Sequence, residues 1–97
     1  MAETREARRY FVSGVVQGVG YRFFARDAAE RLSIAGFVRN RYDSRVEVYA
    51  IGRPEQLGAL RAVLARGPWA GRVERVEEEP AGVDPHYTEG FAIEEDA

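Results

Sequence analysis

Three glycines and an arginine fall within the nine residues from Gly14 to Arg22. Glycines at 14, 18 and 20 allow positive φ angles and a close approach of the backbone to a ligand. From Val15 through Tyr21 there is no Ser, Thr, Asp or Asn, so a helix that starts here lacks a side-chain acceptor for its first amides. An external anion could bind those amides, and Arg22 is the first cation of the helix. The stretch therefore predicts an anion site that suits phosphate.

Asn40 is the second candidate for chemistry. A helix of about 12 residues after the loop rises roughly 18 Å, and a strand from Phe37 then returns at ~3.3 Å per residue. This spacing brings Asn40 back toward the level of the loop without placing it in contact. Its amide can orient a water without becoming charged. Amides, Arg22 and Asn40 together can bind phosphate and position water but supply no strong general acid. Such a site suits a substrate whose leaving group needs no proton, such as an acyl phosphate.

The missing residue types narrow the chemistry further. The 97-residue chain has no cysteine and one histidine, which excludes a thiolate nucleophile and a histidine-rich metal site. No G-K-[ST] follows the glycines, and no acidic motif is typical of a Mg²⁺ site, which argues against a P-loop. The glycine spacing is not G-x-G-x-x-G either, and no parallel nucleotide-binding fold is indicated.

Composition and charge define the broad class of protein. Hydrophobic residues make up 45% and charged residues 31% of the chain, as in ordinary soluble domains. The formal net charge of −2 argues against a dominant electrostatic grip on nucleic acid. No apolar run approaches the ~20 residues that span a bilayer, and residues 1–9 have no apolar signal core. We therefore expect a cytoplasmic monomer with no nucleic-acid or membrane partner.

The glycine loop is expected to join a strand to a helix. Residues 8–15 alternate as a strand does. Residues 21–33 carry an apolar stripe at helical spacing. Its members are Tyr21, Phe24, Ala25, Ala28, Ala29 and Leu32. Gly36 is placed to stop this helix, and residues 37–42 then form a second strand.

A tight hairpin turn at 42–45 leads into a third strand at 45–51. Val46 and Val48 alternate there with Glu47 and Tyr49, which predicts a strand buried on one face only.

A second helix is expected from Pro54 to the stop at Gly67-Pro68, followed by a fourth strand. The buried face of this helix would consist of Leu57, Leu60 and Leu64. Trp69 is expected to lie as a lid over the edge of the core. In the fourth strand, at 72–79, Val73 and Val76 break the alternation and predict a bulge. Residues 90–94 form a short last strand, and the tail 95–97 is expected to be solvated.

The order of elements is β-α-β-β-α-β with a short extra strand, the split βαβ pattern of ferredoxin-like folds. We predict an α+β sandwich in which one mostly antiparallel sheet carries both helices on one face. Residues 1–97 would form a single domain with its core at about 8–94.

The two candidate segments resemble two signatures of the acylphosphatase family. Gly14-Val15-Val16-Gln17-Gly18-Val19-Gly20-Tyr21-Arg22 is similar to the first, G-x-V-Q-G-V-x-[FY]-R, and Gly36-Phe37-Val38-Arg39-Asn40 is similar to the second, G-[FY]-V-x-N. The gap between them and the order of elements also fit. The resemblance extends from about Arg8 to Ile93, almost the whole chain.

The resemblance implies an enzyme that hydrolyses small acyl phosphates to a carboxylate and inorganic phosphate without metal, cofactor or covalent intermediate. Arg22 would bind the phosphoryl group, and Asn40 would hold the attacking water, whose proton the substrate's own phosphate would accept. The backbone of the loop would hold the phosphoryl oxygens, through Val16, Gln17, Gly18, Val19, Gly20 and Tyr21. The family's strand order, 4-1-3-2 with the last strand at the edge, is implied as well.

Two other functions compete with this one. A non-catalytic phosphate- or carbamoyl-phosphate-binding module could use the same loop, as similar domains do inside larger hydrogenase-maturation carbamoyltransferases. Those carry zinc-finger cysteines, which this sequence lacks. An RNA-binding ferredoxin-like domain would need exposed aromatic residues in an RNP-type strand, a pattern that residues 45–51 do not fit.

Single residues leave alternatives of their own. Gln17 could brace the loop by hydrogen bonds within it or touch the substrate. Tyr21 and Phe24 are expected to pack in the core rather than stack on a substrate, because they lie on the helix stripe. His86 is expected to be a solvated surface residue. Ser44 stands where the family usually has glycine, and a positive φ there would cost serine about 1 kcal/mol relative to glycine.

Overall fold

The computed structural model describes residues 4–97 and contains five strands and two α-helices. In chain order these elements are β1 (Glu6–Val15), α1 (Tyr21–Arg31), β2 (Ala35–Asn40), β3 (Val46–Gly52), α2 (Pro54–Arg66), β4 (Arg72–Ala81), the short 3₁₀ helix η1 (Pro85–Tyr87) and β5 (Phe91–Ile93). The predicted order of elements is confirmed, and η1 lies within the stretch expected to be a loop.

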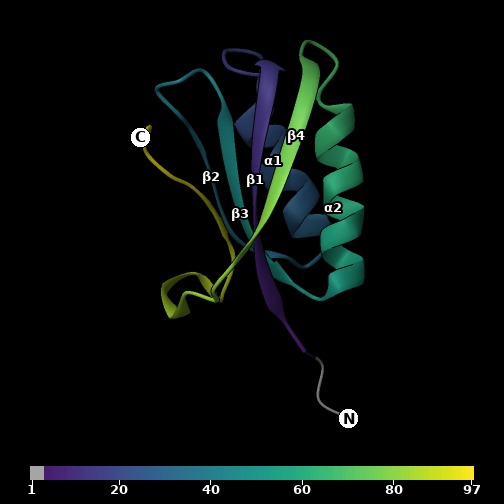
Figure 1. The fold of residues 1–97 in the computed structure, drawn as a ribbon, viewed down its shortest axis with the longest axis vertical. Helices are drawn as coiled ribbons and strands as arrows, with labels where there is room; N and C mark the ends of the chain where they lie inside the picture. Colours follow the sequence, from purple (N-terminus) through teal and green to yellow (C-terminus); the bar gives the residue numbers. More distant parts are fainter. Residues whose placement is uncertain (1–3) are drawn as a thin grey trace.

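The strands form one sheet in the order β4-β1-β3-β2-β5. Neighbouring strands are antiparallel except β2 and β5, which are parallel. Both helices cover the same face of the sheet (Figure 1). The β1–α1 loop, the β2–β3 hairpin and the α2–β4 loop all lie at one end of the sheet, the top of Figure 1. The ferredoxin-like α+β fold is therefore confirmed, with the strand order that the family resemblance implied.

The main core lies between the sheet and the helices. Four valines of the three central strands are fully buried there: Val12, Val38, Val46 and Val48. The predicted face of α2 is confirmed, because Leu57, Leu60 and Leu64 are all 0% exposed. Burying each such leucine contributes roughly 1.5–3 kcal/mol. This packing fixes α1 and α2 on the sheet, and with them the loops at the top.

The predicted role of Gly36 as the stop of the first helix is wrong. The helix ends at Arg31, where Ser33 adopts a φ of 58° and its amide bonds to the carbonyl of Glu30. The Ile34 amide bonds to the carbonyl of Ala29, which completes a Schellman motif with serine in the usual glycine position. Gly36 lies inside β2 with a φ of 137°, and a Cβ there would lie 1.9 Å from the Tyr49 carbonyl oxygen. Its glycine is needed because β3 approaches so closely.

The expectation that the third strand is buried on one face only is also wrong. Every residue of β3 is buried, because a second cluster that includes Phe37, Tyr49 and Ile51 covers the face away from the helices. Further along the same face, Glu47 is 2% exposed and its carboxylate contacts three guanidinium groups. The contacts are Arg9 at 3.2 Å, Arg39 at 3.0 Å and Arg41 at 3.0 Å. An apolar–charged alternation could not reveal this burial, since arginine side chains supply the cover.

Of two predictions made for β4 and for the loop before it, one is confirmed and one is wrong. The predicted bulge is confirmed, because Ser13 pairs with Arg75 but Gly14 pairs with Val73, which leaves one extra residue in β4. The predicted lid at Trp69 is wrong, since this side chain is 99% exposed. The amide of Gly71 bonds to the carbonyl of Pro68, so Trp69 lies at the tip of a turn and points away from the core.

Candidate functional site

The glycine loop is anchored at both ends and open in the middle. Val16 and Tyr21 are each 1% exposed, and the Tyr21 hydroxyl donates to the carbonyl of Leu64 at 2.8 Å. Gly18 and Gly20, in contrast, are exposed and have φ angles of 75° and 78°. A Cβ at either glycine would meet nothing within 4 Å. These two are glycines for their backbone conformation, which turns the loop without placing a side chain over it.

Helix α1 begins at this loop without a side-chain cap. Gly20 is its N-cap in the left-handed conformation, no side chain caps the helix, and the first turn contains no acidic residue. The first amides therefore keep their capacity to donate, and the helix dipole adds a partial positive charge. This confirms the uncapped helix start expected from the sequence.

Tyr21 packs in the core as predicted. Burial raises the pKa of its hydroxyl well above the ordinary value of 10.0. The hydroxyl is committed to Leu64 and stays protonated, so Tyr21 anchors the loop and supplies no proton to a ligand. Phe24 packs against the same core, with its ring centroid 5.6 Å from that of Tyr21.

Arg22 lies in the first turn of α1, and its side chain is 37% exposed. Its Nη1 lies 3.7 Å from Oδ1 of Asp96, in the C-terminal tail. The guanidinium is therefore accessible at the loop and is faced by one carboxylate. A phosphate group is a suitable bidentate partner for the remaining donors of such a guanidinium.

Asn40 is the last residue of β2 and is 9% exposed. Its side-chain oxygen Oδ1 is buried and accepts no hydrogen bond from residues 4–97. Buried polar atoms are nearly always satisfied, so an unpartnered acceptor indicates a place for a water or a ligand donor. The amide oxygen is the type of group that was predicted to hold a water here.

The tail after β5 connects the surroundings of Arg22 and Asn40. It continues along β2, where the Glu94 amide donates to the Val38 carbonyl at 2.9 Å and the Ala97 amide donates to the Asn40 carbonyl at 3.0 Å. Asp96, between these two contacts, faces Arg22. Arg22 and Asn40 thus contact neighbouring residues of one segment. The tail was expected from the sequence to be solvated, because no local pattern in Glu95–Ala97 indicates that it pairs with β2.

The side chain of Gln17 braces the loop. It does so by bonding to the β2–β3 hairpin and not, as one alternative predicted, to the loop itself. Its Nε2 donates to the carbonyls of Arg41 at 2.8 Å and Arg45 at 2.9 Å. Both carbonyls belong to the β2–β3 hairpin, which begins directly after Asn40. Within this hairpin, Arg45 pairs with Asp43 at 2.7 Å and lowers the pKa of that carboxyl group.

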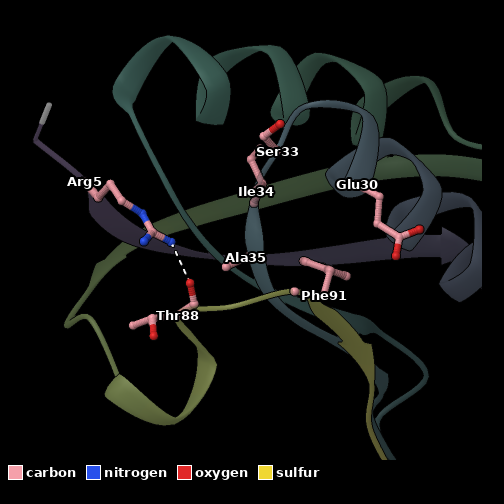
Figure 2. A pocket seen from close by; sticks show the side chains of 8 residues that line it. Arg5, Glu30, Ser33, Ile34, Ala35, Thr88 and Phe91 are labelled. Atoms are coloured by element: carbon pink, nitrogen blue, oxygen red, sulfur yellow. Dashed lines mark hydrogen bonds between the residues drawn. The ribbon is translucent and has the colours of Figure 1, made fainter.

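A separate hollow of about 420 Å³ lies at the other end of α1, beside the α1–β2 connection (Figure 2). Arg5 and Thr88 lie next to each other on one side of it, joined by a hydrogen bond of 3.1 Å from Arg5 Nη2 to the Thr88 carbonyl. Glu30 and Phe91 also line it. None of the predicted site residues does, so this hollow is distinct from the glycine-loop site.

Residues 4–97 contain no group of three or more histidine or carboxylate side chains that could hold a metal ion. No helix in this part of the chain is long and apolar enough to cross a membrane.

The chain is a small α+β domain with a ferredoxin-like sheet and an open glycine loop that leads into an uncapped helix. Such a helix start can bind a phosphate group. Residues 8–93 match the acylphosphatase family. The acylphosphatase of Koribacter versatilis is 50% identical over 94 residues, which cover 97% of this chain and 84% of that protein. The chain belongs to the acylphosphatase family, and the predicted enzyme class, an acyl-phosphate hydrolase, is confirmed.

Solved structures agree with this assignment. The acylphosphatase from Bacillus subtilis superposes with a TM-score of 0.85 at 30% identity, covering 93% of this chain and 98% of that one. HypF from T. kodakarensis has a TM-score of 0.80 at 28% identity, but the match covers 92% of this chain and 12% of HypF. The fold thus occurs both as a small separate protein and as a part of a much larger one.

Proposed function

We propose that one positioned water cleaves the acyl phosphate, with Arg22, the loop backbone and Asn40 as the working groups. The water oxygen attacks phosphorus, the bond from phosphorus to the acyl oxygen breaks, and the products are a carboxylate and inorganic phosphate. The observation that carries the proposal is Oδ1 of Asn40, a buried acceptor without a partner within residues 4–97. It lies at a strand end beside the segment that contacts Arg22.

The binding half of the site would consist of the loop and Arg22. The amides from Val16 to Tyr21 would donate to the phosphoryl oxygens, and the exposed glycines leave room for them to approach. The Arg22 guanidinium would neutralise charge that builds up on the same oxygens during transfer. Because phosphoryl transfer depends mainly on positioning and charge stabilisation, such a site needs few reactive side chains.

The hydrolytic half would consist of Asn40 and its water. Oδ1 would accept one O–H of the water and leave an oxygen lone pair directed at phosphorus. The substrate's own phosphate would accept the proton released on attack. The carboxylate leaves as a stable anion, so the absence of a general acid from the predicted set of residues is no obstacle.

We also propose that residues 1–97 act as one domain and as a monomer, in the cytoplasm, without nucleic-acid or membrane partners and without metal or cofactor. The net charge of −2 supports the lack of a nucleic-acid partner. The main core, which α1 and α2 form together with the sheet, supports a single domain. Residues 1–3 of this domain lie outside the described structure.

The proposal is tested by hydrolysis of acetyl or benzoyl phosphate in the presence of EDTA. We expect turnover by the wild type and its loss in Arg22→Ala and Asn40→Ala, with folding checked by circular dichroism. Arg26→Ala serves as the matched control, since it removes an arginine one turn further along α1. Normal turnover in Asn40→Ala would refute the water-positioning role. Phosphate binding by calorimetry without hydrolysis would favour the non-catalytic binding module instead.

A further inference from the structure

The two halves of the proposed site lie on strands that do not pair with each other. The loop follows β1 and Asn40 ends β2, but the sheet order places β3 between these strands. No ladder hydrogen bond therefore runs directly from the strand that leads into the loop to the strand that carries Asn40. Their separation has to be set by contacts beyond the ends of the strands.

The side chain of Gln17 makes such a contact. It reaches past the end of β3 to the neck of the β2–β3 hairpin, where it donates both Nε2 hydrogens to the carbonyls of Arg41 and Arg45. Those carbonyls also close the turn, since the Ser44 amide donates to Arg41 at 3.1 Å and the Arg41 amide donates to Arg45 at 2.8 Å. Each carbonyl oxygen thus uses both of its lone pairs. The hairpin and the loop are locked to each other at this point.

We propose that Gln17 is a positioning residue that sets the distance between the phosphate-binding loop and the water held by Asn40. The inference rests on the proposed function. Gln17 sits in the middle of the loop, between Val16 and Gly18, and Arg41 follows Asn40 directly in the chain. The Gln17 side chain therefore connects the centre of the phosphate-binding loop to Arg41, the residue next to Asn40. Since both hydrogens of Nε2 are committed to the hairpin, this nitrogen has no hydrogen left to donate to a phosphoryl oxygen.

The test compares two variants of similar shape. Gln17→Met keeps the length of the side chain and removes both donors. Because a displacement near 1 Å can cost on the order of 100-fold in rate, we expect kcat for benzoyl phosphate to fall by about 10- to 100-fold. The inhibition constant of inorganic phosphate should change by less than about threefold, since the loop amides and Arg22 remain. Gln56→Met is the matched control, because Gln56 also bonds to backbone, at Leu32, but far from the loop. It should lower stability and leave kcat unchanged.

Gln17→Glu adds a pH signature that a purely structural role would not produce. Its ionised carboxylate faces two carbonyl oxygens and can donate nothing, whereas the protonated carboxyl regains one O–H donor. We expect kcat of Gln17→Glu to recover in part as the pH falls through the titration of this carboxyl, relative to Gln17→Met. A double-mutant cycle with Asn40→Ala, measured on the residual turnover of that variant at high enzyme concentration, completes the test, because Gln17→Met should have little further effect once the water ligand is gone.

Three results would overturn the positioning role. They are an unchanged kcat in folded Gln17→Met, a weakened phosphate affinity at unchanged kcat, and full additivity with Asn40→Ala. Failure of the wild type to hydrolyse any acyl phosphate is a different outcome, since it would overturn the proposed function itself.

Discussion

Neutralising Asp96 should increase the affinity of the enzyme for inorganic phosphate. Its Oδ1 lies 3.7 Å from Nη1 of Arg22, the guanidinium proposed to bind the phosphoryl group. Phosphate that takes Arg22 must therefore compete with a carboxylate already beside it. The Asp96→Asn variant removes that competitor while it keeps the size of the side chain and the pairing of the tail backbone with β2.

The structure limits the size of the effect. Two unit charges at this distance interact by about 1 kcal/mol in water, and exposed ion pairs are worth about 0.2–1 kcal/mol. The lower dielectric of a protein interior does not apply here, because the side chains of Arg22 and Asp96 are 37% and 52% exposed. With tenfold in affinity for every 1.4 kcal/mol, Asp96→Asn should lower the dissociation constant of phosphate by up to about fivefold.

Calorimetry of phosphate binding at two ionic strengths would measure this change. The Debye length is about 30 Å at 0.01 M and about 3 Å at 1 M, so the gain should be clear at low salt and nearly absent at high salt. Glu95→Gln is the matched control, with the same change in net charge at the neighbouring residue. Equal phosphate affinity of Asp96→Asn and wild type at low salt would contradict the competition. An equal gain in Glu95→Gln would show a general charge effect in its place.

Two further predictions concern stability. Glu47→Gln should lower the free energy of unfolding by about 3 kcal/mol in urea titrations, because it leaves three guanidinium groups around a buried neutral amide; an unchanged urea midpoint would contradict this. Tyr21 has a raised pKa in the fold, so its contribution is complete below pH ~10 and declines as the pH rises beyond the unfolded value. Tyr21→Phe should therefore cost about 1 kcal/mol at neutral pH but weaken the decline of stability above pH 10, and a decline as steep as that of the wild type would refute the reasoning.

The features that the sequence predicted correctly are local ones. The α1 stripe and the leucine face of α2 follow from helical periodicity, and the bulge in β4 follows from broken alternation. The open glycine loop and the uncapped start of α1 could be predicted because their signal lies in residue types alone: glycines where positive φ is needed, and no capping side chain before Arg22. Such features need no knowledge of which segments meet in space.

The features that the sequence missed depend on contacts between distant segments. Gly36 has the spacing of a helix stop, but its glycine is required by the carbonyl of Tyr49 on the neighbouring strand. Glu47 alternates like an exposed residue, yet it is buried under arginines from β1 and β2 and the residue that follows β2. The contact of Asp96 with Arg22 requires the tail to run along β2, which depends on the parallel pairing of β5 at the sheet edge. None of these could be inferred from periodicity.

Ser44 adopts a turn conformation that glycine accommodates more readily. Its φ is 76°, at a cost of about 1 kcal/mol relative to glycine. Asp43 offsets part of this cost, because its side chain accepts a hydrogen bond from the Arg45 amide at 3.1 Å and pairs with the Arg45 guanidinium. The turn therefore keeps the shape that closes its neck. Because the carbonyls at that neck are the acceptors of Gln17, the contacts of Asp43 also help to hold the partners on which the loop depends.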